Sequence, residues 1–103
     1  MKRYKVVFLP TAMTDMQASY DWGCSVWGTE EANNWVRKMS TACLGKLSNM
    51  PERFPLAQED EQFDVTVRQM IVGRYRVLFT IKAKTVYIFH IQGSYVGNTE
   101  EAD

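Results

Sequence analysis

The sequence predicts an α+β domain: one strand, then a helical hairpin, then a three-stranded antiparallel meander, in the order β-α-α-β-β-β. Two observations lead to this prediction. Three β-rich runs lie between residues 64 and 91 with very short loops between them, and two stretches with apolar residues at helical spacing precede them. The helices are then expected to cover one face of a small sheet.

The meander is predicted from the stretch DVTVRQMIVGRYRVLFTIKAKTVYIFHI, with strands at Val65–Val72, Tyr75–Ile81 and Thr85–Ile91. Loops of two or three residues between β-branched and aromatic runs are typical of consecutive hairpins. Gly73 in the first loop can adopt the positive φ that a tight turn needs.

The first strand is expected at Tyr4–Leu9, ending at Pro10, which cannot donate to a ladder. Thr11 or Thr14 is then a candidate N-cap for a helix that ends near Trp27. Thr29 is a candidate N-cap for the second helix, and Asn49-Met50-Pro51 ends it. Each helix has an apolar face, which we expect to pack on the sheet; the members are Ala12, Met16, Tyr20, Gly23 and Trp27 in the first helix and Ala32, Trp35, Val36, Met39, Cys43, Leu47 and Met50 in the second.

Length and composition favour a single domain. The 103 residues are 46% hydrophobic, and we expect residues 1–96 to form the domain and residues 97–103 a frayed acidic tail. The apolar run Val6–Leu9 is too short for a signal peptide or a membrane span, so the expected compartment is the cytoplasm. One histidine and two cysteines nineteen positions apart offer no zinc spacing, and no phosphate loop or Rossmann fingerprint appears. No metal or cofactor is therefore expected.

The net charge is zero, but basic and acidic residues are concentrated in different parts of the sequence. The meander is basic, whereas the connection before it, Pro51–Phe63, is acidic. This distribution favours an acidic or anionic partner over general coating of nucleic acid.

Strand parity separates the arginines of the meander. Because alternate side chains face opposite sides of a strand, Tyr75, Val77, Phe79 and Ile81 form the apolar face expected against the helices. Arg76 is then expected to point to an open second face, while parity does not fix the facing of Arg68, and Arg74 sits at the turn. The alternative for Arg76 is an ion pair with Glu59 or Asp60.

The opening YKVVFLPTAMTDMQASYDW, the PERFPLA turn and above all VRQMIVGRYRVLFTI followed by VYIFHI resemble the RelE/ParE superfamily of bacterial toxins, closer to its ParE-like side. The resemblance runs from Tyr4 to Ile91. It implies the toxin of a type II toxin–antitoxin module, with a cognate antitoxin protein as partner. RelE-like members cut mRNA, commonly on the ribosome, and ParE-like members poison DNA gyrase.

A ribonuclease would need a base, an acid and a cation for the phosphate. The candidates are His90, Arg76 and Tyr95. The alternative for His90 is a strand histidine with an ordinary hydrogen bond. The acidic connection, the neutral chain and Gln92, which stands where RelE-like enzymes often carry a basic residue, count against this activity. We therefore favour the gyrase inhibitor.

Antitoxin binding is predicted to use an apolar groove with charged anchors, because a disordered segment must offset its ordering entropy on binding. The helical hairpin would supply Trp27 and Trp35, and the meander Arg68, Arg74 and Arg76. The alternative for the Trp side chains is the core. A third function stays open: a non-toxic family member that acts only as a binding partner.

Overall fold

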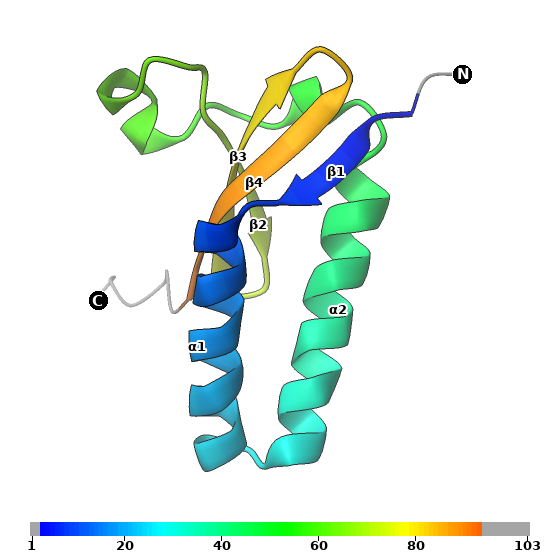
Figure 1. Ribbon diagram of the computed structural model, residues 1–103, viewed down its shortest axis with the longest axis vertical. Helices are drawn as coiled ribbons and strands as arrows, with labels where there is room; N and C mark the ends of the chain where they lie inside the picture. Colours follow the sequence, from blue (N-terminus) through cyan, green and yellow to red (C-terminus); the bar gives the residue numbers. More distant parts are fainter. Residues whose placement is uncertain (1–2, 94–103) are drawn as a thin grey trace.

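The computed structural model describes residues 3–93 and has the predicted α+β order (Figure 1). Residues 94–103, including Tyr95 and the predicted acidic tail, lie outside the described residues. The elements are β1 (Lys5–Phe8), α1 (Pro10–Val26), α2 (Thr29–Leu47), the 3₁₀ turns η1 (Pro51–Arg53) and η2 (Gln58–Gln62), β2 (Arg68–Val72), β3 (Tyr75–Lys82) and β4 (Thr85–Gln92).

The four strands form one sheet in the order β1-β4-β3-β2. Strands β2, β3 and β4 are the predicted antiparallel meander. Strand β1 runs parallel to β4, with Lys5 opposite Thr85 and Phe8 opposite Ile88. The sequence alone does not place this strand, because a four-residue run carries no record of its partner.

Both hairpin turns use residues with positive φ. Gly73 has φ of 61°, as predicted, and Ala83 in the second turn has φ of 56°. The left-handed region suits glycine and costs an alanine roughly 1 kcal/mol. Strand β2 begins at Arg68, later than the predicted Val65, because Val67 bonds to the preceding connection: its carbonyl accepts from the N–H of Ala57 at 2.8 Å.

Each helix begins at or before the residue predicted as its N-cap. Pro10 is the first residue of α1 and Leu9 its N-cap, so the predictions of Thr11 and Thr14 as caps are wrong. Proline suits the first helical position because its missing N–H has no partner there anyway. Gly28, with φ of 102°, is the N-cap of α2, and Thr29 lies inside the helix. Helix α1 ends at Val26 with Trp27 as its C-cap, close to the predicted end.

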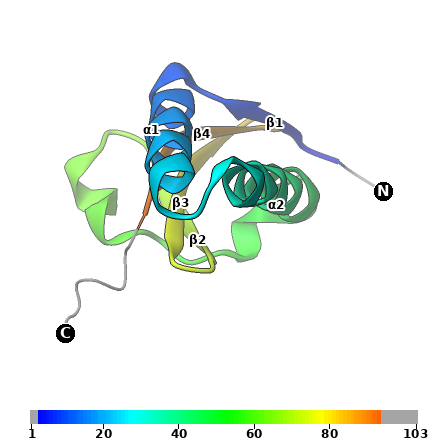
Figure 2. The same ribbon diagram turned by 90° about the horizontal axis from the view of Figure 1, so that it is seen from below.

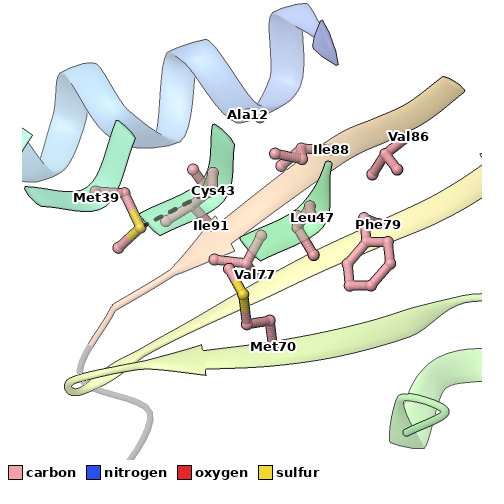
Figure 3. Packing of buried hydrophobic residues seen from close by; sticks show 10 residues of the cluster. All are labelled: Ala12, Met39, Cys43, Leu47, Met70, Val77, Phe79, Val86, Ile88 and Ile91. Carbon is pink, nitrogen blue, oxygen red and sulfur yellow. Dashed lines mark hydrogen bonds between the residues drawn. The ribbon is translucent and has the colours of Figure 1, made fainter. Parts of the chain in front are cut away.

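The main core lies between the helical hairpin and one face of the sheet (Figures 2 and 3). Both helices lie side by side over that face (Figure 2), and Val77 and Phe79 belong to the core cluster on it, as parity predicts. The buried cluster consists of Ala12, Met39, Cys43, Leu47, Met70, Val77, Phe79, Val86, Ile88 and Ile91.

The second face of the sheet is covered, which corrects the expectation of an open face. Leu78 is 1% exposed there and packs with Ala57 and Val67 from the connection between α2 and β2. The start of this connection packs instead on the main core, where the ring centroid of Phe54 lies 6.0 Å from that of Phe79. The acidic connection is therefore a second layer over the sheet.

The helical hairpin extends beyond the sheet at the end where α1 turns into α2 (Figure 1). This overhang exposes large apolar side chains: Trp22 at 52%, Val26 at 56% and Trp27 at 43%. Within residues 3–93, neither helix is long and apolar enough to cross a membrane.

Candidate functional site

Arg76 lies at the centre of a buried polar cluster on the second face of the sheet. Its two terminal nitrogens bind the two carboxylate oxygens of Glu59 in η2, at 2.9 Å for Nη1 to Oε1. Nη1 also donates to Oε1 of Gln69 in β2 at 2.9 Å, and Nη2 donates to Oε1 of Gln92 in β4 at 2.7 Å. The guanidinium thus joins three elements around β3.

The alternative given for Arg76, an ion pair with Glu59, is the one that the structure contains. Only 5% of the residue is exposed, and the hydrogen bond from Arg76 holds the pKa of the Glu59 carboxyl below its usual range. A bidentate arginine–carboxylate pair is among the stronger charge-assisted contacts in proteins. Its effect here is to fasten the acidic connection to the sheet, so Arg76 does not face solvent as an open cation.

A bulge in β4 brings His90 to its position. Leu78 pairs with His90, but the next residue, Phe79, pairs with Ile88, so Phe89 is an extra residue in β4. The insertion changes the facing of the strand, and Ile88 and Ile91 both enter the main core although they are three positions apart.

The first turns of α1 hold this bulge. The N–H of Leu9 donates to the carbonyl of Ile88 at 2.9 Å, and the hydroxyl of Thr11 donates to the carbonyl of Phe89. One turn later, Oδ2 of Asp15 accepts from the N–H of Ile91 at 2.9 Å. Beyond the end of β1, the first turns of α1 are therefore the neighbour of β4. The side chains of Thr11 and Asp15 bind the β4 backbone there.

The same Asp15 oxygen lies 2.9 Å from Nδ1 of His90. Because a carboxylate oxygen accepts, the Nδ1–H is the donor of this bond, and Nε2 is the ring nitrogen that Asp15 does not contact. The His90 side chain is 40% exposed and lines a shallow cleft of about 340 Å³ with Pro10, Thr11 and Asp15. The Asp15 carboxylate, whose side chain is 28% exposed, is thus the partner of His90.

The structure describes two of the three predicted ribonuclease residues, Arg76 and His90. Arg76 and His90 both lie on the second face of the sheet, but Glu59 occupies the guanidinium, and His90 interacts with Asp15. The remaining member, Tyr95, lies outside the described residues.

The three predicted arginine anchors do not converge. Arg68 is half-buried at the start of β2, and its Nη1 donates to the carbonyl of Phe54 at 2.7 Å, so it holds the connection in place. Arg74 is exposed in the turn at the other end of β2. Of the three, Arg74 has the accessibility that a surface anchor requires.

The predicted Trp pair lines one groove. Trp27 and Trp35 form a hollow of about 520 Å³ along α2 with Glu31, Asn34 and Lys38. Trp35 is half-buried, with its ring centroid 4.8 Å from that of Tyr75. Because Tyr75 is the first residue of β3, this contact brings the turn between β2 and β3, which carries Arg74, to the wall of the groove.

The cysteines have the structural role expected for small apolar side chains. Cys43 is fully buried in the core, where desolvation raises the pKa of its thiol to about 12, and its Sγ lies 4.0 Å from Sδ of Met39 (Figure 3). Cys24 is half-buried in α1. Within residues 3–93, no three His, Cys, Asp or Glu side chains come together as metal ligands.

Sequence reasoning missed the roles of Asp15, Gln69 and Gln92. Asp15 is one helical turn after Thr11, and both bind the β4 backbone. That spacing was the available signal, but it becomes meaningful only once β4 is known to run beside α1. The glutamines are found only through the strand register, which places Gln92 opposite Arg76.

Comparison with known proteins agrees with this geometry. Residues 6–94 match the family of the ParE toxin of type II toxin–antitoxin systems, parDE. No curated protein matches the chain in sequence.

Two solved structures show the same fold. A chain of the chromosomal ParDE toxin–antitoxin system from P. aeruginosa aligns with a TM-score of 0.72 and 20% identity, covering 87% of this chain and 95% of that one. A chain of the toxin–antitoxin complex RelBE2 from Mycobacterium tuberculosis aligns with a TM-score of 0.59 and 24% identity, covering 92% and 95%. With the family match extending over most of its length, the chain belongs to the ParE toxin family of type II toxin–antitoxin systems.

Proposed function

We propose that this toxin inhibits DNA gyrase by binding to it and that a cognate antitoxin neutralises it by binding. The observation that carries the choice of gyrase over RNA is the closed environment of Arg76. A ribonuclease needs an accessible cation at the scissile phosphate. Here Glu59 binds the guanidinium and leaves 5% of Arg76 exposed.

The groove of Trp27 and Trp35 supports the antitoxin part of the proposal. It combines apolar surface with Lys38 and Glu31, and its wall residue Trp35 contacts Tyr75, which follows Arg74 in the chain. An acidic amphipathic segment that orders on binding fits such a surface, since the apolar contacts offset its ordering entropy and the cations fix its register. Both similar structures come from toxin–antitoxin systems.

Antitoxin binding is tested with two charge reversals at hairpin turns. Arg74→Glu lies in the turn next to Tyr75, which contacts the groove residue Trp35, whereas Lys84→Glu lies in the other hairpin turn, and both residues are exposed. We expect Arg74→Glu to weaken the complex by about tenfold or more, because it places a carboxylate against acidic side chains. Equal affinities for the two variants would remove this groove from the interface.

The target is tested by expressing the toxin from a tightly controlled promoter while mRNA integrity and DNA breaks are followed in the same cells. Gyrase inhibition predicts double-strand breaks and SOS induction with intact message. A supercoiling assay with purified gyrase and toxin should show inhibition that added antitoxin reverses. Rapid mRNA cutting with intact DNA would refute the gyrase proposal.

The ribonuclease remains the second candidate because of one observation, the Asp15–His90 pair. A carboxylate on Nδ1 orients the imidazole and leaves Nε2 to exchange a proton, as a general acid or base requires. If message is cut, His90→Ala should abolish cutting while the fold persists. Cells that show neither DNA breaks nor mRNA cutting would favour the non-toxic binding partner.

A further inference from the structure

One end of the molecule gathers half of the chain's twelve basic residues. This basic end is built from the residues before and within β1, the turn between β3 and β4, the last turn of α2, and η1 (Figure 1). Its cations are Arg3, Lys5, Lys46, Arg53, Lys82 and Lys84.

Hydrogen bonds link these segments into one continuous surface. The N–H of Lys5 donates to the carbonyl of Lys84 at 2.9 Å, and Arg3 donates to the hydroxyl of Ser48 at the end of α2. Arg53 in turn donates to the carbonyl of Lys46. These bonds hold residues from four parts of the sequence side by side, so the backbone positions that carry the charges are fixed relative to one another.

The six cations are available to a partner. All six residues are exposed, and within residues 3–93 none of them has a carboxylate oxygen within ion-pair distance. Glu52, the acid next to them in η1, accepts a hydrogen bond from the hydroxyl of Tyr4. In the connection that follows, Glu59 and Asp60 bind Arg76 and the N–H of Val67.

We propose that this basic end binds the phosphate backbone of duplex DNA. Its charges are separated over several segments, and phosphates along a duplex present a comparable spread of negative charge. An acidic peptide that orders on binding would need an apolar groove among the cations. The grooves along the helices and beside His90 contain none of the six.

The position of this surface adds a consequence that rests on the proposed function. The basic end lies at the opposite end of the molecule from the overhanging helical hairpin (Figure 1). A toxin bound to gyrase could therefore contact the DNA that the enzyme holds while the hairpin contacts protein. The basic end would then favour gyrase that is loaded with DNA over free gyrase.

The test measures binding of the purified chain to a labelled duplex of 20 base pairs, by fluorescence anisotropy at several salt concentrations and without gyrase. We expect the logarithm of the association constant to fall with the logarithm of salt concentration with a slope of about −5, the value for six phosphate contacts. The double variant Lys82→Gln, Lys84→Gln should reduce the slope by about 2 and the affinity by about tenfold at low salt.

The matched control compares single variants: Arg37→Gln removes one charge from an exposed position on α2 outside the groove of Trp27 and Trp35, and Lys84→Gln removes one charge from the basic end. We expect Arg37→Gln to bind DNA like the parent chain. A second pair, Lys5→Gln with Lys46→Gln, tests the same surface, and circular dichroism confirms that each variant is folded. Equal losses in test and control variants would show attraction by overall charge only and overturn the proposal.

Two further arms identify the partner and separate this inference from the gyrase proposal. Stronger binding to a polyglutamate peptide than to the duplex would overturn it in favour of an acidic protein. Stronger binding to single-stranded RNA would also overturn it. If the duplex binds as expected but supercoiling is not inhibited, the proposal of DNA binding holds and the gyrase proposal fails. If supercoiling is inhibited but the duplex does not bind, only the proposal of DNA binding is refuted.

Discussion

Arg76 and Glu59 form a two-armed ion pair that fastens η2 to β3 across the second face of the sheet. The pair links residues seventeen positions apart and is completed by Gln69 and Gln92 from the neighbouring strands. The acidic connection thereby becomes part of the folded body, and the cation that sequence reasoning offers to a substrate serves the fold.

Glu59→Gln should destabilise the fold by about 3 kcal/mol, because it leaves the charge of Arg76 buried without its carboxylate. Glu61→Gln is the matched control, since Glu61 lies in the same turn and is exposed. Its effect should stay within about 0.5 kcal/mol. Urea unfolding of both variants measures the difference, and similar midpoints for the two would contradict the stabilising role of the pair.

The same pair predicts a loss of stability in acid. The pKa of Glu59 is lowered in the folded state from its ordinary value of 4.5 by the hydrogen bond from Arg76. The unfolded state therefore takes up the proton first as pH falls. The stabilisation is complete above pH 4.5 and is lost as pH falls through the lower folded pKa. The free energy of unfolding should fall less between pH 6 and pH 3 in Glu59→Gln than in Glu61→Gln.

The facing of a side chain could be predicted where it follows from the alternation of residues along a strand. It could not be predicted where it depends on a partner that is distant in sequence. The facing of Val77 and Phe79 follows from strand alternation, and the structure confirms it. Arg76 was placed on the correct face, but its burial depends on where η2 folds back, which no local pattern records. Asp15 looked like an ordinary surface acid until the bulge in β4 placed an N–H and an imidazole beside it.

Asp15→Ala should cost about 1–3 kcal/mol, the penalty for leaving the half-buried N–H of Ile91 without its acceptor. Asp21→Ala is the control on the same helix, because Asp21 is exposed and its carboxylate bonds only to Gln17 among the described residues. Hydrogen exchange offers a second measurement: the amide of Ile91 should exchange faster in Asp15→Ala. Unchanged protection would mean that the carboxylate does not hold the bulge.

Two glycine substitutions should change the free energy of unfolding in opposite directions. A Cβ on Gly93 would lie 2.4 Å from Cε2 of Tyr75, whose ring is already packed on Trp35, so Gly93→Ala should destabilise by about 1–3 kcal/mol. A Cβ on Gly45 meets nothing within 4 Å, and this residue lies inside α2. Gly45→Ala should therefore stabilise by up to about 1 kcal/mol. Thermal melting of both variants checks the pair; a stabilising Gly93→Ala would show that the ring moves freely.

Thiol labelling should separate the two cysteines. Burial keeps Cys43 protonated, with a pKa of about 12, whereas Cys24 is only half-buried. The thiolate is the reactive form, so one thiol should label in the native protein and the second only on unfolding. A Cys24→Ala variant assigns the faster thiol. Rapid labelling of that variant under native conditions would show that the core opens around Cys43.

The parallel pairing of β1 with β4 bears on how the protein is made. Residues 5–8 pair with residues 85–88, so β1 finds its neighbour only after eighty further residues have been synthesised. Contacts so distant in sequence close late in folding, after the local hairpins. The nascent toxin therefore carries an incomplete sheet until β4 has left the ribosome, and activity that depends on the closed fold can begin only after that point.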